Sequence, residues 1–226
     1  MPLKTLVFGA IGVLVETSDL QRQSFNAAFA ANSLDWDWSY ETYKKLLHVN
    51  GGKNRVRYFA EKTSTPLSET QIEAIHQSKT DIYESLIKDG GLRARNGIAD
   101  LIQSAKQIGI KVGMASTTSI QNIDAIFAAT KDLNKDDFDF ILSGADVKTV
   151  KPEPEIYLEA INRAQSNPVD IVVIEDTPVS AQSARSAQLA VVIYPGTMTK
   201  NQDLDIGNAV ISEKDLTLEK LGQWLG

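Results

Sequence analysis

Five short segments of the chain are continuously apolar, are rich in β-branched residues and end in small or acidic residues. They are LVFGA at 6–10, IKVGMAST at 110–117, FDFILSG at 138–144, DIVVIED at 170–176 and AVVIYPG at 190–196. Continuous apolar runs of this length are typical of strands that are buried on both faces. The pattern therefore predicts five buried strands.

Amphipathic segments with helical spacing alternate with the last four of these strands. They cover residues 97–109, 119–130, 153–165 and 179–189. Strands that alternate with helices indicate an α/β fold with a doubly wound parallel sheet, whose ligand site lies at the carboxyl ends of the strands. The tail from residue 201 adds one more short strand and a helix in this prediction.

The alternation is interrupted between the first and second strands, which about 90 residues separate. This interval carries helical patterns at 20–33, 39–49, 53–63 and 68–89, followed by the Gly-rich segment GGLRARNG at 90–97. It predicts an all-helical cap domain at 17–88, inserted into a core domain made of 1–16 and 89–226.

Composition narrows the choice of partners. The formal net charge is −6, no long basic run is present, and there is no cysteine. We therefore expect no nucleic acid or anionic membrane as the main partner, and thiolate chemistry is excluded. The start of the chain, KTLVFGAIGVLV, is similar to a secretory signal, but acidic and hydroxyl residues follow it without a cleavage site. We expect a cytoplasmic monomer.

Hydroxyl and lysine side chains follow two of the predicted strands. Ser116 and Thr117 end the second strand and open a helix, where a hydroxyl and helix amides can bind a phosphate oxygen. The same residues are also ordinary helix caps. Lys151 precedes Pro152 ahead of another helix, and it is either a ligand-binding cation or a solvated side chain.

Two adjacent carboxylates, Glu175 and Asp176, close the fourth strand. At the end of a buried strand they repel each other unless a cation or a lysine compensates them. Oxygen ligands of this kind suit magnesium, so the pair predicts a metal site. The alternative is that one acid only caps the next helix.

A glycine-rich turn in the helical insertion contains Gly51, Gly52, Lys53 and Arg55. Flexible backbone amides, the positive end of a helix and two cations together suit an anion. The alternative is an ordinary turn between helices with a solvated lysine. We favour the anion site.

The predicted layout is similar to the haloacid dehalogenase superfamily with a helical cap. In that family the first strand ends in DxDGT, followed by a Ser or Thr, a Lys and an acidic pair in later motifs. Ser116, Lys151 and the pair Glu175–Asp176 match these later motifs. The DxDGT positions hold Gly9, Ala10, Ile11, Gly12 and Val13, so only the glycine agrees.

The likeness narrows to the CbbY group, the xylulose-1,5-bisphosphate phosphatases associated with carbon fixation. It extends from about residue 3 to residue 200 and is specific in the cap, where Gly51, Gly52, Lys53 and Arg55 match a loop that binds the distal phosphate of the substrate. Glu16 and Arg22 match as well, while Gln21 replaces a usual histidine and Ser180 a usual glycine.

This resemblance implies a changed activity. In the family the first aspartate attacks phosphorus and the second transfers the proton. Gly9 has no side chain for attack, and Ile11 has no proton to give. Asp176 and Glu175 would then form a weakened magnesium site. We expect a binder of a phosphorylated, pentulose bisphosphate-like sugar that has lost or nearly lost hydrolysis.

Two other functions stay open at this point. The chain could still be a weak or altered magnesium-dependent sugar-phosphate phosphatase, with Glu16 or Asp176 in a new role. It could also be an interaction protein in which the cleft is a relic.

Overall fold

The computed structural model describes residues 3–88 and 91–225. Its core is one six-stranded, fully parallel sheet with the order β3-β2-β1-β4-β5-β6. The predicted α/β fold with a doubly wound parallel sheet is therefore confirmed. The strands are β1 (Thr5–Phe8), β2 (Lys111–Ala115), β3 (Phe140–Leu142), β4 (Ile171–Glu175), β5 (Ala190–Ile193) and β6 (Ala209–Val210).

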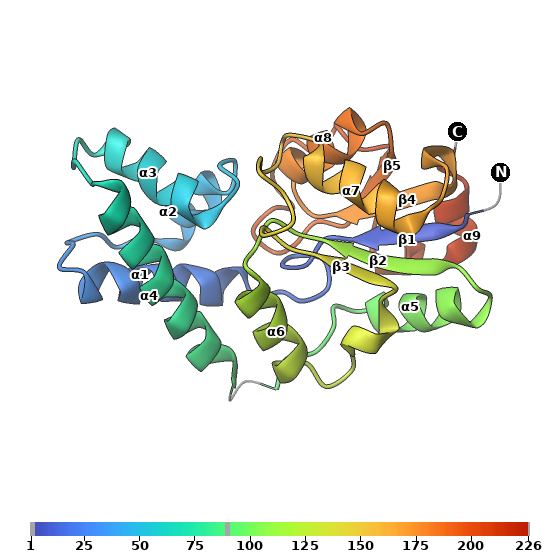
Figure 1. The fold of residues 1–226 in the computed structure, drawn as a ribbon, viewed down its shortest axis with the longest axis horizontal. Helices are drawn as coiled ribbons and strands as arrows, with labels where there is room; N and C mark the ends of the chain where they lie inside the picture. Colours follow the sequence, from blue (N-terminus) through green and yellow to red (C-terminus); the bar gives the residue numbers. More distant parts are fainter. Residues whose placement is uncertain (1–2, 89–90, 226) are drawn as a thin grey trace.

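Helices cover both faces of this sheet (Figure 1). Side chains alternate along β1, so that Leu6 and Phe8 belong to one hydrophobic cluster and Val7 to the other. The first cluster includes residues of α5, α6 and α9, and the second includes residues of α7 and α8. These helices are α5 (Ile98–Gln107), α6 (Ile120–Ala129), α7 (Glu155–Ala164), α8 (Pro178–Ser186) and α9 (Leu218–Gly222).

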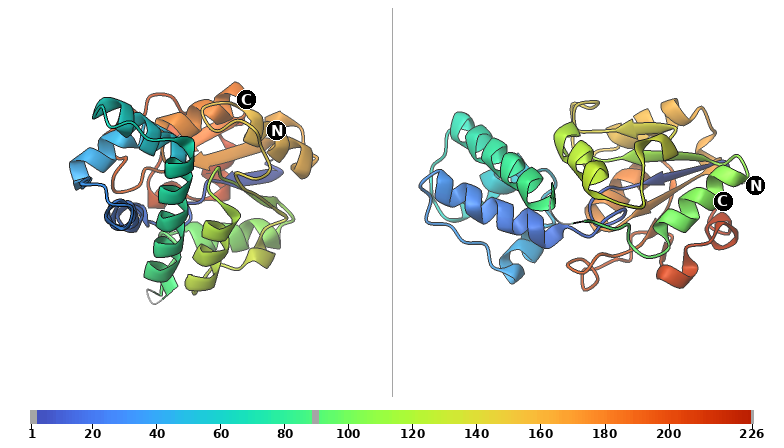
Figure 2. Two further views of the ribbon diagram at one scale, coloured as in Figure 1. Left: turned by 60° about the vertical axis from the view of Figure 1, so that its left-hand side comes forward. Right: turned by 90° about the horizontal axis from the view of Figure 1, so that it is seen from below.

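Four further helices lie between β1 and β2 in the chain and stand apart from the sheet (Figure 1). They are α1 (Ser18–Ala31), α2 (Tyr40–Leu46), α3 (Gly52–Lys62) and α4 (Glu69–Lys88). In both views of Figure 2, α1 and α4 lie side by side. We call these four helices the cap; the boundaries of the predicted cap domain stay a prediction, and residues 89–90 lie outside the described part.

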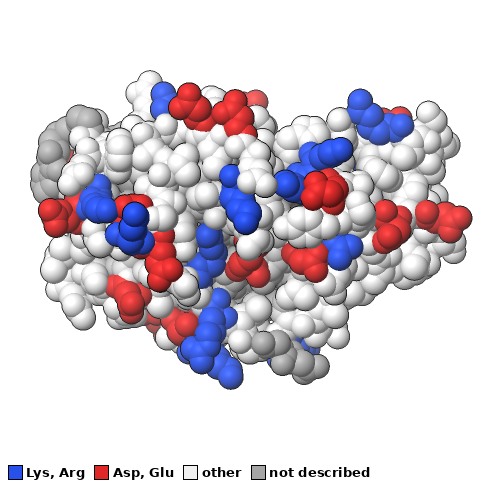
Figure 3. All heavy atoms as spheres, turned by 180° about the vertical axis from the view of Figure 1, so that it is seen from behind, with Lys and Arg blue, Asp and Glu red and all other residues white. Residues whose placement is uncertain are grey.

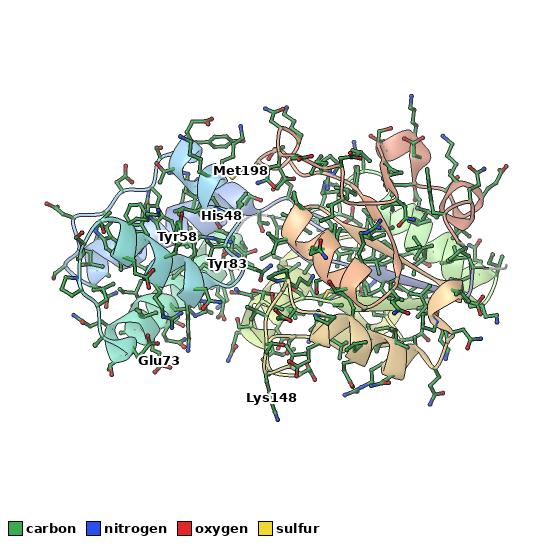
Figure 4. The ribbon with its side chains drawn as sticks, turned by 90° about the horizontal axis from the view of Figure 1, so that it is seen from above. His48, Tyr58, Glu73, Tyr83, Lys148 and Met198 are labelled. Carbon is green, nitrogen blue, oxygen red and sulfur yellow. The ribbon has the colours of Figure 1, made fainter. Side chains whose placement is uncertain are left out.

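The cap has a hydrophobic cluster of its own, built around Phe25, Phe29 and Trp38. Two side chains connect it with the core where the two parts meet (Figure 4). Met198, from the loop after β5, is buried in the cap cluster, and Tyr83 of α4 is buried in a core cluster. Cap and core therefore share apolar packing on both sides of the junction.

The predicted segments are longer than the observed elements at most ends. The predicted strand at 138–144 is reduced to Phe140–Leu142 because the 3₁₀ turn η1 (Lys135–Asp137) precedes it and an Asp146 side-chain bond to the Ser143 amide begins a turn after it. None of the helices within 3–88 and 91–225 has the length and apolar character needed to cross a membrane.

Candidate functional site

A cavity of about 180 Å³ lies between the cap and the carboxyl ends of the strands, where the doubly wound sheet predicts a ligand site. Both parts of the chain line it. The core contributes Ala10, Ile11, Ser116, Thr117, Lys151, Glu175, Asp176 and Ser180, and the cap contributes Gln21, Gly51, Gly52, Arg55, His76 and Lys79, among others.

A buried ion pair between Lys151 and Glu175 forms the floor of the site. The two side chains are only 4% and 2% exposed, and the hydroxyl of Tyr157 also bonds the Glu175 carboxylate. Lys151 Nζ further donates to the Ala115 carbonyl at 3.2 Å. Burial and the Glu175 charge raise the pKa of Tyr157 well above its usual value. A lysine thus compensates one acid of the pair at the strand end.

Asp176 is the second acid of that pair. Burial and the neighbouring Glu175 charge raise the pKa of the Asp176 carboxyl well above its usual value. Its carboxylate lies against Gly12, whose φ of +86° is in the left-handed region that favours glycine. The N-cap of α8 is Thr177, which accepts a bond from the Ser180 amide at 3.2 Å. Asp176 is therefore not the cap of this helix.

The backbone at Gly9 and Ile11 passes directly beside these acids. The Gly9 amide donates to the Ile174 carbonyl at 3.0 Å, and Ile11 lines the cavity with an apolar, half-buried side chain. A Cβ atom added to Gly9 would lie 2.6 Å from Glu175 Oε2. The Glu175 carboxylate therefore occupies the space that a side chain at residue 9 would need.

The hydroxyl residues after β2 have separate partners. Ser116 Oγ accepts a bond from the Thr118 amide at 3.2 Å, and Ser119 supplies the N-cap of α6. Ser119, and not Ser116, therefore caps helix α6, so the alternative that Ser116 is an ordinary helix cap does not hold. Thr117 Oγ1 donates to Asn50 Oδ1 in the cap at 2.7 Å, so this residue connects core and cap.

The glycine-rich turn of the cap opens into the cavity, but its two cations differ. Arg55 lines the cavity and donates to the carbonyls of Leu46 at 3.1 Å and Val49 at 3.0 Å. Lys53 pairs with Glu73 at 3.2 Å on the surface of the cap and is not among the residues that line the cavity. The structure thus brings Gly51, Gly52 and Arg55 to the site and leaves Lys53 outside it.

Glu16 and Arg22 also lie outside the lining of the cavity. Glu16 accepts bonds from the Ser18 hydroxyl and the Thr197 amide, both at 2.7 Å. Arg22 pairs with Asp19 at 2.7 Å and donates to the Trp38 carbonyl at 3.0 Å. In this structure both side chains hold neighbouring segments together.

Two residues of α4 that the sequence reasoning missed, His76 and Lys79, line the cavity. Burial and the charge of Lys79 lower the pKa of His76 to about 4, and burial and the charge of Arg55 lower the pKa of Lys79 to about 7. Lys79 lies on the buried stripe of α4 together with Ile72, Ile75 and Tyr83. A lysine at an apolar position of the helical pattern was the available signal.

The donors that could hold a magnesium ion are few. Glu175 is engaged by Lys151 and Tyr157, and positions 9 and 11 supply no carboxylate. Within the described residues no group of three or more His, Cys, Asp or Glu side chains is placed to hold a metal. Magnesium requires near-octahedral oxygen ligands, and Asp176 alone does not provide a matching donor set.

This fold, with a polar cavity at the strand ends beneath a helical cap, agrees with the family comparison. Residues 3–188 match the haloacid dehalogenase-like hydrolase family, and the chain belongs to that family. Within it the chain is a homologue of the CbbY proteins. It is 38% identical to Protein CbbY of Rhodobacter capsulatus over 204 residues, which cover 90% of each chain.

Two solved CbbY structures from Rhodobacter sphaeroides have the same fold. The complex with phosphate superposes with a TM-score of 0.90 at 33% identity and covers 97% of this chain and 99% of that one. A mutant in complex with xylulose-1,5-bisphosphate has a TM-score of 0.88 at 32% identity and covers 99% of both chains. The resemblance to the haloacid dehalogenase superfamily and its CbbY group is thereby confirmed.

Proposed function

We propose that this chain binds a phosphorylated sugar of the pentulose bisphosphate type in the cavity between cap and core, and that it has lost or nearly lost phosphomonoester hydrolysis. The binding half of the proposal is supported by the family, since a CbbY relative holds xylulose-1,5-bisphosphate. It is supported as well by Ser116, Lys151 and Arg55, a hydroxyl and two cations that line one cavity.

The loss of hydrolysis follows from one observation: residues 9 and 11 carry no acidic side chain. Hydrolysis through a covalent phospho-enzyme needs an in-line nucleophile and a group that protonates the leaving oxygen. Gly9 offers neither group. Ile11 has no proton to donate, and its methyl groups exclude water from the part of the cavity that this residue lines. Loss of a nucleophile costs on the order of 10⁶ in turnover. This corresponds to about 8 kcal/mol of barrier.

The remaining groups do not replace the missing pair. The Lys151 ammonium is held by Glu175, and the Glu175 carboxylate is held by Lys151 and Tyr157. The Lys151 ammonium can stabilise the negative charge of a bound phosphate. Neither Lys151, Glu175 nor Tyr157 presents a free oxygen nucleophile. Burial and the neighbouring Glu175 charge raise the pKa of the Asp176 carboxyl, so these surroundings disfavour the carboxylate form that would act as a nucleophile. Binding without turnover is the consequence.

The surface supports a small ligand as the partner. Lys and Arg side chains are interspersed with Asp and Glu over the face seen in Figure 3, as the net charge of −6 anticipates. Within the proposal the chain acts as a monomer and binds neither nucleic acid nor membrane. Light scattering coupled to size-exclusion chromatography measures the monomer directly.

Calorimetric titration and phosphate release with a pentulose bisphosphate test the proposal together. We expect saturable binding and phosphate release at least about 10⁴-fold below a typical turnover of about ten per second. Ser116→Ala should weaken binding without changing the melting temperature by more than about 2 °C. Turnover near one per second, or a phosphoryl group trapped covalently on the protein, would overturn the loss of hydrolysis. Absence of binding would overturn the whole proposal.

A further inference from the structure

Lys79 is a buried cation without a counter-charge. Its residue is 3% exposed, and within residues 3–88 and 91–225 its Nζ has neither an ion pair nor a hydrogen bond to another side chain or carbonyl. Its neighbours are aromatic: Nζ lies 5.4 Å from the ring centre of Phe25 on α1 and 4.9 Å from that of Tyr83 on α4. Lys79 is one of the residues that line the cavity between cap and core.

The surroundings of Lys79 favour its uncharged form. Burial removes the ammonium from water, and the Arg55 guanidinium from α3 repels it, so the pKa of Lys79 falls to about 7. The other titratable groups that line the cavity from the cap are Tyr43 of α2 and His76 of α4, and neither supplies a negative charge at neutral pH. From the core, Glu175 is already paired with Lys151, and Asp176 lines the cavity as a buried carboxyl whose pKa is raised by burial and by the Glu175 charge.

A free amine at neutral pH is a nucleophile toward carbonyl carbon. At pH 7 an amine with a pKa near 7 is about half unprotonated, roughly 10³-fold more than a solvated lysine. The rings of Phe25 and Tyr83 flank the amine at 5.4 and 4.9 Å and restrict the positions that the side chain can take. The same arrangement would position a reactive amine.

We propose that Lys79 captures the carbonyl group of a phosphorylated aldehyde or ketose as an imine. The Nζ lone pair attacks the carbonyl carbon, the C–O π bond opens to give a carbinolamine, and loss of one water leaves the C=N bond. Two protons leave nitrogen, and they depart with the carbonyl oxygen as water. No oxidant or reductant takes part, and the step is reversed by water.

This inference rests on the proposed function in one respect, that the captured compound carries a phosphate. Ser116, Lys151 and Arg55 line the same cavity and would bind that phosphate while Lys79 reacts with the carbonyl. The aldehyde pyridoxal 5′-phosphate joins a phosphate and a reactive carbonyl in one molecule, and it is the probe for the test.

The full chain is incubated with pyridoxal 5′-phosphate at pH 7.5, reduced with borohydride, digested and analysed by mass spectrometry. We expect the reduced adduct on Lys79 at least about tenfold above that on Lys53, because burial and the Arg55 charge lower the pKa of Lys79 to about 7, whereas Lys53 is exposed and paired with Glu73. Lys79→Met should abolish this adduct. Lys79→Arg, whose guanidinium stays protonated and forms no imine, should abolish it as well, whereas Lys53→Met should leave it unchanged.

A pentitol bisphosphate, which has no carbonyl, separates this inference from the proposed function. If it binds by calorimetry and protects Lys79 from labelling, both stand. If it binds while Lys79 takes up no label, imine capture is overturned and phosphosugar binding is kept. If Lys79 is labelled but the pentitol bisphosphate neither binds nor protects, imine capture is supported and the proposed function fails. Equal labelling of Lys79 and Lys53 overturns the inference.

Discussion

The Oε2 atom of Glu175 lies 2.6 Å from the position that a Cβ atom on Gly9 would take. The parallel register pairs Phe8 with Ile174, so the residues that follow them meet at the same edge of the sheet. A contact this short is not available to a real Cβ atom, so either Glu175 or the backbone must move when residue 9 gains a side chain. The Lys151–Glu175 pair thus depends on glycine at position 9.

The variant Gly9→Ala tests this dependence with one added carbon. It should lower the free energy of unfolding by about 1–3 kcal/mol, because the methyl group meets Glu175 and the Val13 side chain, which lies 2.9 Å away. Gly222→Ala in α9 is the matched control, since nothing lies within 4 Å of its added Cβ. Denaturant unfolding measures both variants, and equal stabilities would contradict the packing argument.

The double variant Gly9→Asp with Ile11→Asp places two carboxylates beside Glu175 and Asp176. Without metal it should melt about 5–10 °C below the natural sequence, because buried like charges repel. Addition of 10 mM magnesium chloride should raise the melting temperature of the double variant, because a metal that binds only the folded state stabilises that state. The melting temperature of the natural sequence should shift by less than about 2 °C.

Scanning calorimetry with and without the metal checks this prediction. A double variant that melts at or above the temperature of the natural sequence in a chelator would contradict it. Ile11→Val, which keeps an apolar side chain, serves as the control for general disturbance of the loop and should show no metal dependence.

Much of the fold could be predicted because buried parallel strands appear in the sequence as continuous apolar runs. The run at 170–176 is apolar from Ile171 to Ile174 of β4, and the two acids Glu175 and Asp176 lie at the strand end. That topology alone places Ser116, Lys151 and Asp176 at one edge of the sheet, where the structure brings them together.

Side-chain pairing could not be predicted in the same way. Whether Glu175 turns toward a metal or toward Lys151 depends on Tyr157, which lies on helix α7 and not on the strand that carries Glu175. Lys53 looked equivalent to Arg55 in the sequence, yet the position of Glu73 on α4 draws it to the surface. Long flexible side chains follow tertiary partners, and those partners are distant in the chain.

His76 predicts how stability changes in mild acid. Its pKa is lowered from 6.5 to about 4 in the folded protein, so between these values the unfolded chain binds the proton and the folded chain does not. Stability therefore rises with pH across this window and falls as pH drops below 6.5. From pH 7.5 to pH 5 this group should remove at most about 2 kcal/mol of the free energy of unfolding.

Comparison with His76→Gln isolates this contribution. The variant should lose less stability than the natural sequence between pH 7.5 and pH 5, as measured by urea unfolding at both values. His48→Gln removes the other of the two histidines and is the control. The loss of stability between pH 7.5 and pH 5 should be smaller in His76→Gln than in His48→Gln. Equal losses in the two variants would contradict the assignment of this pH dependence to His76.

Substitutions of Arg55 and Lys53 should affect ligand binding differently, although only one residue lies between them. Arg55 holds the Leu46 and Val49 carbonyls and faces the cavity, so Arg55→Ala should weaken pentulose bisphosphate binding by at least about tenfold and also lower the melting temperature. Lys53→Ala removes only an exposed pair with Glu73, which is worth about 0–1 kcal/mol of stability, and should leave the affinity within about twofold. Calorimetric titration of both variants distinguishes two cases. In the first, only Arg55 of the glycine-rich turn binds the ligand; in the second, the turn closes on the ligand and Lys53 binds it too. Equal losses of affinity would mean that Lys53 leaves Glu73 and reaches the phosphate when the ligand is bound.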